Sequence, residues 1–135
     1  CQMLVGRLAD SIGPRWPTLT ASTCVALSAI GIGLFAESVT GLFVFGITGA
    51  AAAWSVSTMM PRLIDYITEA GEKGRVVGMA HLGWSLAMLT GSLWGGQAVE
   101  WDPGLPFFVV SIGCVLTVVF LAVLFRRLDH HSMQA

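Results

Sequence analysis

Long apolar runs alternate with short polar segments along the whole chain. Four runs contain about 20 residues or more, over the ranges 16–36, 41–60, 76–99 and 104–125. A helix needs roughly 20 mostly apolar residues to cross the ~30 Å hydrocarbon core of a bilayer. The pattern therefore predicts an all-α fold, a polytopic bundle with four complete membrane-spanning helices.

The start of the chain and two sites with glycine or proline set the limits of the apolar runs. The chain begins without Met on a short apolar stretch, 1–8, which predicts the last turns of a preceding helix and a truncated N-terminus. Gly13 and Pro14 are expected to break the chain within a loop over residues 9–15. Pro61 is expected to end or kink the second span, and the polar stretch after it could begin with a short interfacial helix.

All seven Lys and Arg residues fall within three polar segments, which are the loops 6–15 and 61–75 and the tail 126–135. If each apolar run crosses once, these segments share one side of the membrane. The two short turns on the other side have no base and carry Glu37, Glu100 and Asp102. By the positive-inside rule the basic side is cytoplasmic. We therefore expect an integral multi-pass protein of the plasma membrane with a cytoplasmic C-terminus.

Composition and charge argue against several other classes of protein. Hydrophobic residues make up 55% of the chain and charged residues 11%, against about 25% charged in soluble domains. A net charge of −1 without a basic stripe excludes nucleic acid as a partner. The three cysteines have no metal or redox spacing, and the pair His130 and His131 lacks a third ligand, so neither a metal nor a cofactor is expected.

The first polar loop has Gly6, Asp10, Gly13 and Arg15 at a spacing that resembles the signature of the major facilitator superfamily, a family of secondary transporters. That signature has a Gly, an Asp after three further residues, a basic residue, any residue, a Gly and then basic positions. Ser11 stands where a basic residue is usual, and Pro14 stands where Arg is common. The positions that keep the pattern are Gly6, Asp10, Gly13 and Arg15.

The resemblance implies a gating role for this loop. In the family the corresponding Asp engages a helix of the opposite half, so Asp10 and Arg15 are expected to form part of a cytoplasmic latch. The other interpretation of Asp10 is a plain turn residue or helix N-cap.

A second segment is similar to the family's Gly-Pro-x-x-Gly-Gly element, with Ser92 in place of the Pro. Its glycines also fit a small-xxx-small motif for helix packing, made by Gly91, Gly95 and Gly96.

The family consists of two six-helix halves, and the order of elements here fits helices two to six of either half. The helix that carries an Arg in the N-terminal half has none here, over residues 41–50. This favours the C-terminal half, helices eight to twelve, and implies the missing half of the same transporter as a partner.

By analogy with the family, the second and third spans line the solute pathway. Each has a polar and aromatic stripe at helical spacing, made by Trp54, Ser55 and Thr58 on the second span and by His81, Trp84, Ser85 and Met88 on the third. The alternative for the aromatic residues is packing between helices. His81 is the one titratable candidate for a coupling proton or ion within the spans, unless it only makes hydrogen bonds at the interface.

The leading hypothesis is secondary transport of a small solute by alternating access within a larger permease. The alternative is a self-contained four-helix membrane protein, such as a small exporter or an accessory subunit. Small exporters normally need a carboxylate within a span, and none is present. An enzyme is not expected, because a membrane enzyme groups His, Asp or Glu near one face and His81 has no carboxylate partner in its span.

Overall fold

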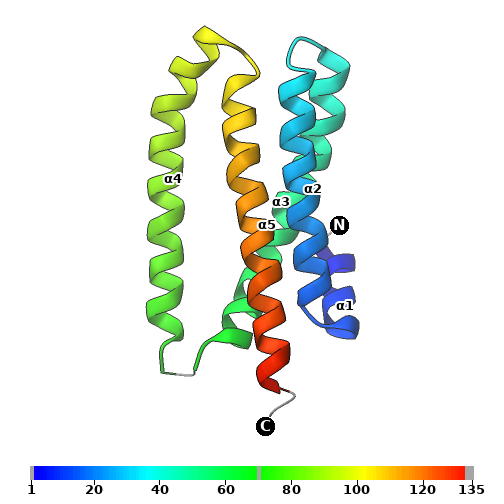
Figure 1. The fold of residues 1–135 in the computed structure, drawn as a ribbon, viewed down its shortest axis with the longest axis vertical. Coiled ribbons are helices and arrows are strands. Elements are labelled where there is room, and N and C mark those ends of the chain that lie inside the picture. Colours follow the sequence, from blue (N-terminus) through cyan, green and yellow to red (C-terminus); the bar gives the residue numbers. More distant parts are fainter. Residues whose placement is uncertain (1, 70, 133–135) are drawn as a thin grey trace.

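The predicted all-α fold is confirmed. A computed structural model describes residues 2–69 and 71–132, and the described residues contain helices and turns without a strand (Figure 1). The helices are α1 (Gln2–Ile12), α2 (Arg15–Leu34), α3 (Val39–Ile67), α4 (Lys73–Trp101) and α5 (Leu105–Ser132). The helices α2 to α5 are each long and apolar enough to cross a membrane.

Several helices are longer than the sequence pattern indicates, and α5 continues to Ser132 through much of the segment expected as a tail. Helix α1 continues to Ile12, because nothing in the sequence stops a helix before Gly13 and Pro14, and Asp10 is therefore helical rather than in a loop. Helix α3 runs through Pro61 to Ile67, so the polar stretch after the proline begins as a continuation of α3 instead of a separate helix. A proline removes one backbone hydrogen bond from a helix, and a long helix with neighbours tolerates that loss.

Helix α2 is the centre of the bundle and packs along both α3 and α5. Its buried side is made of small residues, including Ser22, Ala26, Ala29 and Gly33. Lipid tails are as apolar as these side chains, so moving a large apolar side chain from lipid to a helix interface gains little free energy. Helices therefore associate where small residues let their backbones approach. Large apolar side chains accordingly lie outside, as with Phe43, which is 66% exposed.

The glycines of α2 show how close this packing is. A Cβ at Gly31 would lie within 2.6 Å of the Phe45 ring, and that ring stacks on Phe35 at 5.6 Å between centroids. At the start of α5, a Cβ at Gly104 would meet the backbone carbonyl of Gly33 at 2.7 Å. Small residues are therefore required where α2 meets α3 and where α2 meets α5.

Helix α4 is packed much less than α2. Its contacts with α3 and α5 are sparse, and Ala98 is the one buried residue along its length. Figure 1 shows α4 beside α5, with the two helices joined at the end opposite α1. Most of α4 thus has a surface that no described part of the chain covers.

Candidate functional site

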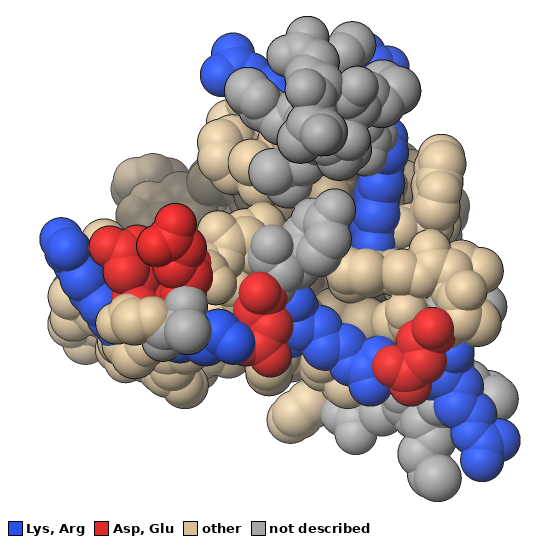
Figure 2. Space-filling model, turned by 90° about the horizontal axis from the view of Figure 1, so that it is seen from below, with Lys and Arg blue, Asp and Glu red and all other residues tan. Residues whose placement is uncertain are grey.

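The basic side chains gather at one end of the bundle, as Figure 2 shows. They come from α1, the first turns of α2 and α4, and the last turns of α3 and α5, which alternate in direction and meet at this end. The seven bases are Arg7, Arg15, Arg62, Lys73, Arg75, Arg126 and Arg127. Four described acids share this end, namely Asp10, Asp65, Glu69 and Glu72, so positive charge is in excess. We call this the basic end.

The turn between α1 and α2 has a backbone that only glycine adopts easily. Gly13 has φ +81°, in the left-handed region, and follows the last residue of α1. Pro14 comes next and accepts a 2.6 Å hydrogen bond from the Thr18 hydroxyl through its carbonyl oxygen. The signature spacing therefore produces a tight reversal that sets Asp10 one turn before the break.

Asp10 forms an ion pair with Arg62 of α3. The Arg62 Nη1 donates to Asp10 Oδ1 at 2.5 Å and to the backbone carbonyl of Gly6 at 3.0 Å, while its Nη2 lies 3.5 Å from Asp10 Oδ2. Both side chains keep contact with solvent, at 67% exposure for Asp10 and 41% for Arg62. One guanidinium thus connects two signature positions of α1 to the end of α3.

Arg62 is a residue that the sequence interpretation counted only as a topological charge. Its position directly after Pro61, in the polar stretch, gave no sign of an acidic partner. The pair spans 52 positions of sequence, so no local pattern could have identified it.

Arg15, the other residue expected in the latch, lies against two aromatic rings. Its guanidinium carbon lies 5.6 Å from the centre of the Trp16 ring and 6.0 Å from that of Phe125, and its Nε is buried. A cation over aromatic faces is held by the ring quadrupole. Arg15 therefore connects the start of α2 to the end of α5.

A second ion pair lies on the same part of α3. Lys73 Nζ, at the start of α4, is 2.5 Å from Asp65 Oδ1. The segment of α3 after Pro61 thereby holds α1 through Arg62 and α4 through Asp65.

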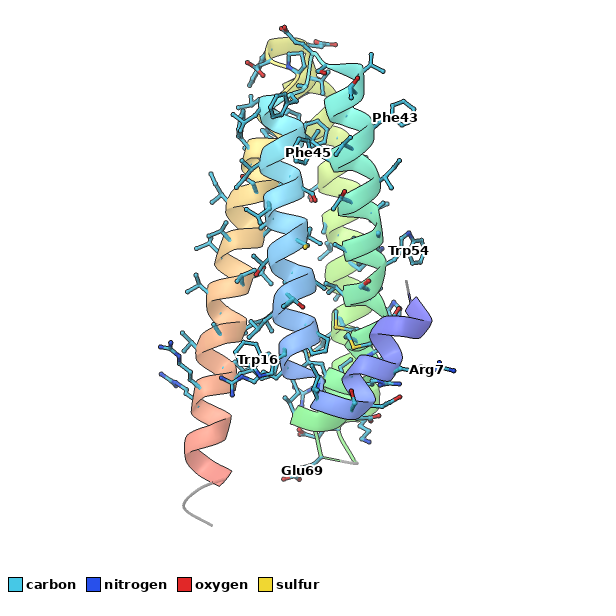
Figure 3. All side chains as sticks on the ribbon, turned by 90° about the vertical axis from the view of Figure 1, so that its right-hand side faces the viewer. Arg7, Trp16, Phe43, Phe45, Trp54 and Glu69 are labelled. Atoms are coloured by element: carbon cyan, nitrogen blue, oxygen red, sulfur yellow. The ribbon has the colours of Figure 1, made fainter. Side chains whose placement is uncertain are left out.

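The predicted lining residues of α3 do not all face one direction. Ser55 is buried, and its hydroxyl donates to the Ala51 carbonyl at 2.8 Å. Trp54 is 65% exposed and points away from the bundle (Figure 3). The Thr58 hydroxyl donates to the Trp54 carbonyl at 2.9 Å. These residues therefore do not combine into one polar surface.

Two of the predicted residues on α4 share a cavity with α3, whereas Ser85 and Met88 are exposed outside it. This cavity has a volume of about 350 Å³ and we call it the α3–α4 cavity. It lies toward the basic end, between the segment of α3 around Pro61 and the first turns of α4. Its lining is Ser57, Met60, Pro61, Ile64, Val77, Ala80, His81 and Trp84.

The glycine motif of α4 faces open space. A Cβ at Gly91, Gly95 or Gly96 would have no neighbour within 4 Å among the described residues, apart from its own helix. Their role in helix packing thus stays a prediction. Within the described residues no group of three His, Cys, Asp or Glu is placed to hold a metal ion. The side chains of His130 and His131 lie outside the described residues.

Comparison with known families gives a match along the whole chain. The sequence model of the Major Facilitator Superfamily matches residues 1–135. Proteins of that superfamily move small solutes across membranes. Neither curated proteins nor solved structures give a significant match.

Proposed function

Because the chain belongs to the Major Facilitator Superfamily, we propose that it forms part of a permease that transports a small solute by alternating access. The observation that carries this proposal is the contact of Arg62 with both Asp10 and the Gly6 carbonyl. Two positions of the family signature thereby meet one guanidinium at the basic end. The partner of Asp10 here is a residue of α3 and not of the opposite half, so in our proposal the pair acts as a latch by holding α1 against α3 in one of two conformational states.

The strength of the Asp10–Arg62 pair suits such a latch. Exposed ion pairs contribute about 0–1 kcal/mol, because water screens the charges and the side chains lose freedom. A contact of this size biases an equilibrium between two states about fivefold without locking it. In our proposal Asp10 and Arg62 form the latch and hold the basic end closed, while Arg15 fastens α2 to α5 and remains in place through the cycle.

The remaining parts of the proposal concern the whole permease. We place the basic end in the cytoplasm of a plasma-membrane protein, because all seven bases lie there. The uncovered surface of α4 and its glycines Gly91, Gly95 and Gly96 are where the other half of the transporter would pack. His81 is the candidate for a coupling proton, as the titratable residue within the spans.

Asp10→Asn in the full-length protein is expected to lower solute uptake about fivefold, because the neutral amide loses the charge attraction to Arg62. The assay is uptake into proteoliposomes of the solute that gives protein-dependent uptake in a screen of labelled neutral, anionic and cationic compounds. Amounts of inserted protein should match the wild type, since Asp10 is exposed.

Glu69→Gln is the matched control. Glu69 lies at the same end, has no ion pair among the described residues and undergoes the same loss of charge. Its uptake should equal that of the wild type. Equal uptake by both variants would exclude Asp10 from gating.

A further inference from the structure

We propose that the α3–α4 cavity binds a neutral and largely apolar small molecule that carries one or two hydrogen-bonding groups. This inference rests on the proposed transport function and names the class of solute. Three properties of the cavity carry it, namely its size, the few polar groups that line it and the state of the hydroxyls around it.

The size of the cavity fits a small organic molecule. At about 350 Å³ it lies near the lower limit of ligand pockets, which range over roughly 300–1,000 Å³. Five of its lining residues are fully apolar, which are Met60, Pro61, Ile64, Val77 and Ala80. A ligand of matching size would therefore be in contact mostly with hydrocarbon.

The lining has three polar side chains, each of which can form hydrogen bonds. The Ser57 hydroxyl, the His81 imidazole and the Trp84 indole N–H make no hydrogen bond to the described part of the chain. Pro61 has no N–H, so it cannot donate to the Ser57 carbonyl as an ordinary helix residue would. The break in the α3 hydrogen-bond ladder therefore lies between two residues of the cavity lining, which also includes His81 of α4.

A charged ligand would find no permanently charged partner in this lining. None of the eight residues is Asp, Glu, Lys or Arg. The neighbouring charges, Asp65 and Lys73, are paired with each other at 2.5 Å. Placing an unpaired ion against apolar side chains costs far more free energy than placing a neutral group there.

A ligand rich in hydroxyl groups is equally mismatched. Three hydroxyls of α3 and α4 outside the cavity, those of Thr58, Thr90 and Ser92, donate to carbonyls within their own helices at 2.7–2.9 Å. A polyol in the cavity would keep most of its own groups unpaired, and each buried unpaired group costs about 1–3 kcal/mol. The lining offers such a ligand only three polar side chains, so a mainly apolar molecule is favoured over sugars and polyols.

The test uses radiolabelled 2-naphthol as the probe, a neutral apolar molecule with one hydroxyl, and the full-length protein in lipid nanodiscs. Ala80→Phe should fill the cavity and weaken binding about tenfold or more. The matched control is Ala87→Phe, because Ala87 is exposed on the same helix outside the cavity. Its affinity should equal that of the wild type, and empty nanodiscs correct for partition into lipid.

Two further variants test the polar anchor without filling the space. His81→Leu should weaken binding of 2-naphthol about fivefold, and His81→Asn, which can still form hydrogen bonds, should recover most of that loss. Equal binding by Ala80→Phe and Ala87→Phe would overturn the site. Displacement of 2-naphthol by D-glucose or by tetraphenylphosphonium, sensitive to Ala80→Phe, would overturn the ligand class. Both results concern binding alone, so they are separate from the effect of Asp10→Asn on uptake.

Discussion

Asp10→Arg is expected to reduce transport at least about tenfold, and the addition of Arg62→Asp in the same protein is expected to restore most of it. The single change sets two guanidinium groups against each other where the wild type has N–H donors 2.5 Å and 3.5 Å from carboxylate oxygens. It therefore removes an attraction and adds a repulsion of similar size. The measurement is uptake by proteoliposomes, normalised to inserted protein.

The exchanged pair should remain below the wild type by about threefold. An Asp at position 62 accepts hydrogen bonds and cannot donate to the Gly6 carbonyl, which Arg62 Nη1 reaches at 3.0 Å. The control is Asp10→Arg combined with Lys73→Asp, since Lys73 lies at the same end but pairs with Asp65. Rescue by this control as strong as by the exchanged pair would mean that net charge, and not the specific contact, governs transport.

Gly104→Ala should destabilise the protein by about 2–3 kcal/mol, which is the second large effect that we expect. Its Cβ would lie 2.7 Å from the Gly33 carbonyl of α2, a backbone atom that no change of rotamer can move. Overpacking of this kind typically costs 1–3 kcal/mol because the helices must separate. The change in unfolding free energy can be measured by denaturant titration in mixed micelles.

Gly113→Ala on the same helix is the matched control. A Cβ there would have no neighbour within 4 Å, so the substitution should be neutral or slightly stabilising through helix propensity. A loss of stability as large as that of Gly104→Ala would contradict the close approach of α2 and α5.

The helical spans could be predicted because a bilayer imposes a length and a composition on each of them. The ends were harder to predict where the chain continues as a helix into polar sequence. Pro61 suggested an end to α3, yet the helix continues to Ile67 because its polar last turns gain two ion pairs, Arg62 with Asp10 and Asp65 with Lys73. Such contacts depend on the tertiary arrangement and leave no local pattern.

The candidate site was predictable only in part for the same reason. Helical spacing indicates which residues share a face, but it does not say which face meets another helix. Ser55 is buried and Trp54, its neighbour, is 65% exposed, although both belong to the predicted stripe. The signature spacing located the turn at Gly13, whereas Asp10 lies within α1 and its partner could be identified only from coordinates.

The most direct test of alternating access is to measure accessibility at both ends of the pathway in one protein. Cysteines would replace Ser57, near the basic end of α3, and Ser92, nearer the other end of α4, in a cysteine-free full-length background. The rate of labelling by a membrane-impermeant maleimide is compared between the protein that keeps Asp10 and the Asp10→Asn variant. If the latch holds the basic end closed, the variant labels Ser57→Cys about fivefold faster from the cytoplasmic side and Ser92→Cys more slowly from the opposite side. Rates that rise together, or that both stay unchanged, would contradict a latch between two alternating states.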